Sequence, residues 1–167
     1  MKALLTYSVL TLLFSISSCG IYSFTGASIS NEVKTITINY FDNNSSLAPP
    51  NIANTLTEAL KDKFVSETNL TFVNNDADLI FEGYISDYSI KPVSIQANET
   101  AAKNRLTISV KVKFTNLTEE SNNYDKTFSQ FFDYESTQDL NSIEESLTEK
   151  IIEQIVENIF NQAVANW

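Results

Sequence analysis

The stretch Arg105-Leu-Thr-Ile-Ser-Val-Lys-Val-Lys-Phe114 alternates strictly between polar and apolar side chains. Its even-numbered positions, from Leu106 to Phe114, are all apolar, and its odd-numbered positions are Arg, Thr, Ser or Lys. Because successive side chains of a strand point to opposite faces, this pattern predicts a strand with one buried face and one solvated face. We therefore expect a sheet that is covered on one side.

Two weaker strand patterns come earlier in the chain. Residues 33–41 alternate, which predicts a strand whose buried face carries Ile36, Ile38 and Tyr40. The polar run 42–46 predicts a turn, and residues 70–73 predict a short strand.

Two long segments on either side of the central stretch also predict strands. Gly83 lies inside the segment 79–90 and predicts a bulge or a close backbone contact. The apolar residues of this segment change phase after Ile85, so the strand either bends or is covered on both faces. The segment 127–134 is rich in aromatic residues.

Two segments have helical spacing. Pro49-Pro50 precede an apolar stripe made of Ile52, Leu56, Ala59, Leu60 and Phe64. A longer stripe recurs at four-residue steps through Ile143, Leu147, Ile151, Ile155 and Ile159. Ser142-Ile-Glu-Glu145 predicts a capping box at its start. The order of strand, helix, strands and helix predicts an α+β fold, with two helices on one face of a mostly antiparallel sheet.

Composition excludes several classes of function. The chain has 167 residues and a formal net charge of −10, which disfavours binding to nucleic acid or to anionic lipid surfaces. It has no histidine and one cysteine, so Ser-His and Cys-His catalytic pairs, internal disulfides and thiolate zinc sites are excluded. We expect no cofactor, no metal and no enzymatic activity.

The N-terminus predicts export and lipidation. Lys2 precedes a short apolar stretch, which is too short to span a bilayer and is typical of a signal peptide. The stretch closes on Ile16-Ser-Ser-Cys19, which resembles a bacterial lipobox. We expect a signal peptide over 1–18, lipidation of Cys19, a tether over 19–32 and a folded domain over 33–167. The alternative is a buried core cysteine after an ordinary signal peptide.

Lys103, Arg105, Lys111 and Lys113 share one parity in the central stretch and are candidate ligands for phosphates or carboxylates. The alternative is a solvated strand face whose lysines discourage edge pairing. The aromatic residues Phe128, Phe131, Phe132 and Tyr134 fit a core better than an apolar groove. The carboxylates of Asp76, Asp78, Glu82 and Asp87 fit a solvated surface better than an acid–base pair.

Scattered segments together resemble a known family. They begin at Cys19-Gly-Ile-Tyr-Ser-Phe-Thr-Gly26 and end at Ile159-Phe-Asn-Gln-Ala-Val-Ala-Asn-Trp167. Between these lie Pro49, Leu56-Thr-Glu-Ala-Leu60, Phe64, Glu82-Gly-Tyr-Ile85, Tyr88, Pro92-Val93, Asn104-Arg-Leu-Thr-Ile108 and Val110-Lys-Val-Lys113. The whole is similar to the LptE family of lipopolysaccharide-assembly lipoproteins, in the form found in Bacteroidetes.

The resemblance implies two helices against a four-stranded sheet. It also implies a non-enzymatic lipoprotein on the periplasmic side of the outer membrane. Such a protein plugs the LptD β-barrel translocon, helps to assemble it, and contacts lipopolysaccharide on its way to the surface. The alternative function is another periplasmic lipid-binding or envelope-complex adaptor lipoprotein. An enclosed apolar cavity would favour a carrier, and a packed core would favour a plug.

Overall fold

The computed structural model describes residues 29–93 and 103–164, so the predicted signal peptide and Cys19 lie outside the described residues. The strands are β1 (Thr35–Ile38), β2 (Asp42–Asn43), β3 (Thr71–Phe72), β4 (Leu79–Val93), β5 (Lys103–Asn116) and β6 (Tyr124–Glu135). The helices are α2 (Ile52–Glu67), α3 (Leu140–Val164) and the short 3₁₀ helix η2 (Glu120–Asn122).

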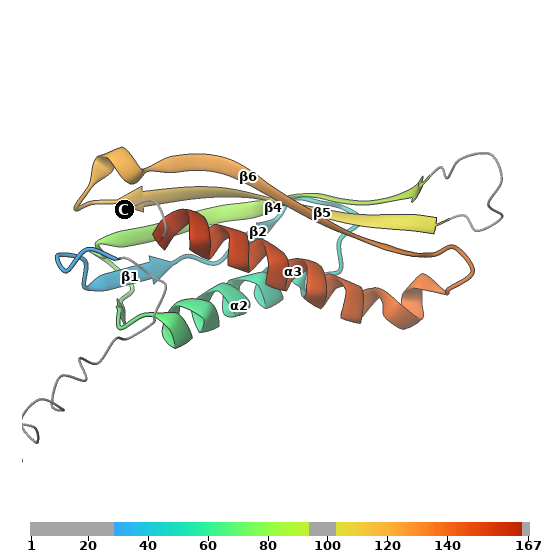
Figure 1. Cartoon of the computed structure of the whole chain (residues 1–167), viewed down its shortest axis with the longest axis horizontal. Coiled ribbons are helices and arrows are strands. Elements are labelled where there is room, and N and C mark those ends of the chain that lie inside the picture. The colour runs from blue at the N-terminus through green and yellow to red at the C-terminus, as the bar shows by residue number, and fades with distance from the viewer. Residues whose placement is uncertain (1–28, 94–102, 165–167) are drawn as a thin grey trace, which may run out of the picture.

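The fold is α+β, with α2 and α3 packed on one face of the sheet, as predicted (Figure 1). The predicted count of four strands is wrong, because the described residues form a mixed sheet of six strands, although most of its paired residues are antiparallel as predicted. The order is β3-β1-β4-β5-β6, and β2 also pairs with β4. β4, β5 and β6 are antiparallel, whereas β1 pairs in parallel with β3 and β4. The parallel pairs arise because α2 crosses over between β1 and β3.

The phase change in β4 has a local cause. The pairing between β4 and β5 shifts register between Ile85 and Asp87, so one extra residue stands in β4. The bulge returns Tyr88 to the buried face that Ile85 occupies, and both side chains lie in the core. Of the two expectations for this strand, the bend is therefore the correct one.

The first strand is shorter than predicted. β1 ends at Ile38, and Tyr40 is 59% exposed while Phe41 is fully buried. Tyr40 was expected on the buried face, and this is wrong because the chain leaves the regular strand after Ile38. The residues expected to form a turn instead include β2, which pairs in parallel with Tyr84 and Ile85 of β4.

Both helices bury the predicted stripes except for Ala59 and Ile143, which are partly buried, and α3 starts earlier than predicted. α3 begins at Leu140, and the Asp139 carboxylate accepts a hydrogen bond from the Asn141 N–H at 3.2 Å. Asp139 is therefore the capping residue. The Ser142 hydroxyl instead donates to the Asp139 carbonyl at 2.7 Å, so the predicted capping box is wrong.

The core lies between the helices and the covered face of the sheet. Phe64 of α2 contacts Phe81 of β4 and Phe160 of α3, with ring centroids 5.1 and 5.0 Å apart. Phe81 in turn lies 4.7 Å from Phe114 of β5. These rings join both helices to the long strands in one packed cluster. Within residues 29–93 and 103–164, no helix combines the length and apolarity that a membrane crossing needs.

Candidate functional site

The face of the sheet opposite the helices is the candidate site, because it carries the basic residues of β5. The odd-numbered side chains of β5 point to this face, which we call the outer face, while Leu106, Ile108, Val110, Val112 and Phe114 are buried against the helices. Pairing with β4 and β6 places Ser and Thr side chains along the middle of the outer face, together with Asp87 and Phe131, and places most of its charged side chains towards the ends. The outer face is therefore mainly polar, and no described helix or strand covers it.

Arg105 makes the strongest polar contact on the outer face. Its Nε and Nη2 donate to the two carboxylate oxygens of Asp133, directly opposite on β6, at 2.7 and 2.9 Å. The guanidinium carbon also lies 3.6 Å from the ring centroid of Phe131. The hydrogen bonds hold the pKa of Asp133 below its ordinary value and raise the pKa of Arg105. The guanidinium is thus fixed by a bidentate partner and a stacked ring.

The three lysines of the predicted set are also paired. Lys103 lies 3.5 Å from Glu135, Lys111 lies 3.3 Å from Asp125, and Lys113 lies 3.1 Å from Glu82. The structure therefore brings all four predicted residues to one face, but each has a carboxylate beside it. Sequence reasoning missed these partners, because they belong to β4 and β6 and only the strand register brings them opposite β5.

The alternative explanation of the lysines is wrong in one part, because they do not protect a sheet edge, although they do lie on a solvated strand face. β5 lies between β4 and β6, so its backbone is paired on both sides. The lysines of β5 instead join three adjacent strands through ion pairs on a half-exposed surface. Such pairs contribute little to stability individually, and phosphate or carboxylate groups of a ligand would compete for the same cations.

The aromatic residues of β6 divide between the two faces. Tyr134 is buried, and Phe128 and Phe132 pack against the core from its margin. Phe131 points to the outer face and is 47% exposed. Three of the four therefore follow the core prediction, and the fourth forms part of the outer face.

Of the four carboxylates that were weighed for acid–base chemistry, Asp78, Glu82 and Asp87 each have a different polar partner. Asp78 accepts hydrogen bonds from the backbone N–H groups of Lys34 and Thr35 at 2.8 and 2.9 Å. These bonds hold the pKa of Asp78 below its ordinary value. Asp78 thus ties the start of β1 to the start of β4, a role that its sequence position does not reveal.

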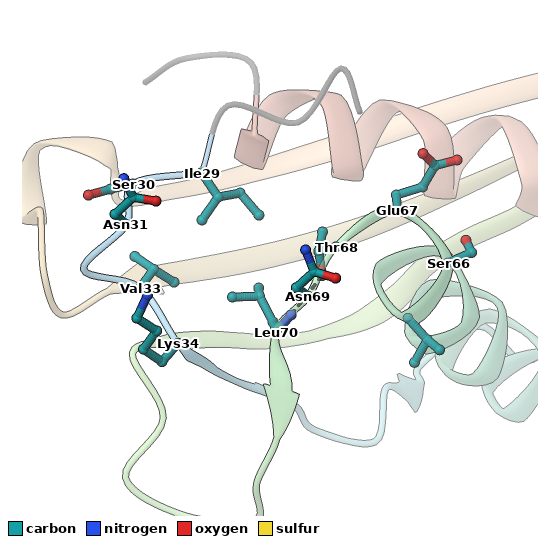
Figure 2. Close-up of a pocket in the computed structure, with 11 residues that line it drawn as sticks. Ile29, Ser30, Asn31, Val33, Lys34, Ser66, Glu67, Thr68, Asn69 and Leu70 are labelled. Atoms are coloured by element: carbon teal, nitrogen blue, oxygen red, sulfur yellow. Dashed lines mark hydrogen bonds between the residues drawn. The ribbon is translucent and has the colours of Figure 1, made fainter. Parts of the chain in front are cut away.

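A surface pocket of about 380 Å³ lies where the described chain begins (Figure 2). Residues 29–34 form one wall, and residues 65–70, from the end of α2 and the loop beyond, form the other. The charged residues of the lining are Lys34 and Glu67, so the pocket has no dominant charge. It marks the end of the domain that is joined to the N-terminal segment.

Two solved structures of bacterial proteins have similar folds. A protein of Xanthomonas campestris has a TM-score of 0.55 at 10% identity, over 83% of this chain and 91% of that one. Lipoprotein B of Nitrosomonas europaea has a TM-score of 0.53 at 13% identity, over 80% and 83%. These identities support similarity of fold only. A comparison with curated proteins finds no significant match.

The sequence itself matches a family model. The model for LptE, described as lipopolysaccharide-assembly, covers residues 33–163. This range begins two residues before β1 and ends one residue before the end of α3, so it includes the whole described sheet, α2 and all but the last residue of α3. The chain therefore belongs to the LptE family of lipopolysaccharide-assembly lipoproteins.

Proposed function

We propose that this chain is lipidated on Cys19, anchored to the periplasmic side of the outer membrane, and assembled with an LptD-type β-barrel that it plugs and helps to fold. In this role it assists lipopolysaccharide transport to the cell surface. The observation that carries the proposal is the family match across residues 33–163. The first and last segments of the sequence further support a member of the Bacteroidetes type.

Family membership gives the broader statement directly. LptE proteins are lipoproteins of the cell envelope and are not enzymes. The packed aromatic centre of the domain favours a plug over a lipid carrier, because a carrier needs an enclosed apolar cavity. The pocket that Figure 2 shows is instead open at the surface and lined by polar and apolar residues together.

Lipidation of Cys19 would limit where the domain can lie. Ten residue steps separate Cys19 from Ile29, so the anchored cysteine reaches at most about 35 Å from the pocket end of the domain. The proposal thus directs that end towards the membrane. The opposite end of the long strands, with Lys103 and Arg105, would extend away from it.

We propose further that Lys103, Arg105, Lys111 and Lys113 contact the phosphate groups of lipopolysaccharide. The arrangement supports this because all four lie on the uncovered outer face. A phosphate would have to compete with Asp133, Glu135, Asp125 and Glu82 for these cations. Binding should therefore weaken as salt rises.

The barrel partnership is tested by affinity purification of the lipidated protein from solubilised outer membrane. We expect a large β-barrel protein to co-purify in a stable complex, and surface lipopolysaccharide to fall when the protein is depleted. A monomeric protein with no barrel beside it would overturn the proposal. Replacement Cys19→Ala should abolish lipid labelling, which tests the anchor separately.

The contact with lipopolysaccharide is tested with the double variant Arg105→Gln/Lys111→Gln. We expect about tenfold weaker binding of purified lipopolysaccharide, as for the loss of roughly 1.4 kcal/mol. The matched control is Lys61→Gln, which removes a cation paired with Glu58 at 2.9 Å on α2. Equal affinity of the double variant and the parent protein would exclude these residues from the contact.

A further inference from the structure

β6 is an edge strand whose outer side has no strand beside it in the described chain. Its twelve residues, Tyr124–Glu135, pair with β5 and with no other described strand. Half of the backbone N–H and C=O groups of an edge strand point away from its neighbour and can pair with an added strand. The length of β6 is twice that of an average strand, so this edge is long.

A groove runs along this edge, between β6 and α3. Three adjacent pockets of about 490, 300 and 380 Å³ follow β6 from Thr127 to Glu135 and α3 from Ser142 to Gln162. We call these together the edge groove. Its walls are the inward side chains of β6, such as Phe128, Gln130 and Phe132, and the flank of α3. An added strand would lie with one side on the β6 backbone and its inward side chains in this groove.

The middle of the edge lacks the charges that usually protect such edges. The segment 127–132, Thr-Phe-Ser-Gln-Phe-Phe, is uncharged, and the charged residues of β6 flank it. Natural edge strands normally carry lysines, prolines or bulges that discourage pairing. The middle of β6 is therefore able to accept a strand.

The flanking charges oppose pairing with a second copy of this chain. A symmetric antiparallel pair centred on Ser129 would place Asp125 opposite Asp133. The neighbouring register, centred on Gln130, would place Asp125 opposite Glu135. Like charges directly opposite one another are destabilising, and two chains of net charge −10 also repel each other. A different polypeptide fits the edge better.

The central pocket of the edge groove also indicates the charge of the side chain that it would hold. Glu153 lines the central pocket beside Gln130, and its carboxylate has no hydrogen-bond or ion-pair partner in the described part of the chain. The other acidic residue of that pocket, Glu157, is paired with Lys63 of α2 at 2.7 Å. A strand added to β6 would bring an inward side chain opposite Gln130 close to Glu153. A lysine or arginine at that position would pair with it.

We propose that the edge groove binds an extended segment of the barrel partner, which adds to β6 as a further strand and places a basic side chain beside Glu153. This inference rests on the proposed function for the identity of the partner. Strands within a closed barrel have no free edge, so the segment must come from a loop or a terminal extension. Hydrogen bonds between the backbones of β6 and the added segment supply the affinity. The carboxylate of Glu153 favours a segment that has a basic residue at the position beside it.

The edge itself is tested without the barrel, on the full lipidated chain in detergent micelles. The probe is a short synthetic peptide of alternating valine and threonine with one central lysine. We expect it to slow amide hydrogen exchange in β6 and to bind about tenfold more tightly than the same peptide with a central glutamate. Glu153→Gln should reduce this preference, whereas the matched variant Glu149→Gln, which lines the pocket on the α2 side, should preserve it. Absence of β6 protection, or no preference for lysine, would overturn the inference.

The barrel is tested with Gln130→Lys, which adds a positive charge in the middle of the edge. We expect this variant to lose the co-purifying barrel, while Thr107→Lys, with the same added charge on β5 where that strand is paired on both sides, retains it. If no barrel co-purifies with the parent protein, the proposed function is refuted. If both variants retain the barrel equally, the edge inference is refuted and the proposed function is not. The edge inference is also refuted if this chain forms a dimer through β6 that Gln130→Lys dissociates.

Discussion

Gly83 shows how one residue can hold two elements together. It lies in β4 directly against the Phe41 side chain, and a Cβ built at this position would come within 2.6 Å of the Phe41 ring and would overlap the Lys111 carbonyl oxygen. Phe41 is fully buried, so its ring has little freedom to move. The glycine is therefore required by close approach between β4, β5 and the segment after β1.

We predict that Gly83→Ala destabilises the domain by about 3 kcal/mol, because the overlap involves backbone and a buried ring rather than a flexible side chain. Urea denaturation followed by circular dichroism measures the change. Ser89→Ala in the same strand is the control and should alter stability by less than about 0.5 kcal/mol. Equal stability of the two variants would show that β4 can move away from Phe41 and β5 without loss of free energy of unfolding.

Tyr88 is the second residue whose environment makes a sharp prediction. Its ring is buried in the core, and its hydroxyl donates to the Glu144 carboxylate of α3 at 2.6 Å. Tyr88→Phe should lower the free energy of unfolding by about 1.5 kcal/mol, the usual value of a hydrogen bond to a charged group. Glu144→Gln keeps an acceptor and should cost less. If Tyr88→Phe unfolds at the same urea concentration as the parent protein, the hydrogen bond contributes nothing.

At the scale of elements, Thr57 fixes α2 beneath the end of the first strand. Its buried hydroxyl donates to the Ala53 carbonyl at 2.7 Å and accepts from the Phe41 N–H at 3.1 Å. The Phe41 N–H is thus satisfied by a side chain, because the chain has already left β1. One hydroxyl therefore replaces a strand partner.

We predict that Thr57→Val destabilises the domain by about 2 kcal/mol, because it leaves the buried Phe41 N–H without an acceptor. Thr57→Ser keeps the hydroxyl and should retain most of the stability. Thermal unfolding of the three proteins gives the comparison. The reverse order, with the serine variant less stable than the valine variant, would mean that the methyl group matters more than the hydrogen bond.

For the whole molecule, the absence of histidine sets the response to pH. Asp78, Asp133 and Glu157 have pKa values below their ordinary range, because backbone N–H groups, Arg105 and Lys63 respectively donate to them. Their contribution to stability is complete above the ordinary carboxyl pKa of about 4 and is lost as pH falls through the lower folded values. Burial raises the pKa values of Tyr88 and Tyr124, so their contribution is complete below about pH 10 and is lost above it.

We therefore predict that the lipidated protein has a midpoint of thermal unfolding that is constant between about pH 6 and 9, because the chain has no histidine and its single cysteine thiol would carry the lipid. It should fall below about pH 4 and above about pH 10. Scanning calorimetry across the range measures the profile. Tyr88→Phe and Tyr124→Phe should each weaken the alkaline decline, and a steep change near neutral pH would contradict this account.

Alternation and helical spacing were sufficient to predict the long elements. The period-two pattern of 105–114 specified β5 and its buried face, and the apolar stripes specified both helices. Composition also excluded Ser-His and Cys-His catalytic pairs, internal disulfides and thiolate zinc sites. These features are local, because each depends on residues a few positions apart in one element. The face to which a strand residue points was predicted less well where the backbone is irregular, as at the β4 bulge and after Ile38.

Only the tertiary structure decided which strands are neighbours. The two parallel pairings of β1, the addition of β2 and the edge position of β6 depend on contacts between residues distant in sequence. The same is true of the ion pairs: the sequence placed Arg105 and three lysines on one face, but the register of β5 with β4 and β6 supplied a carboxylate to each. Side-chain periodicity is fixed by the geometry of one strand, whereas pairing is chosen by the free energy of the whole fold.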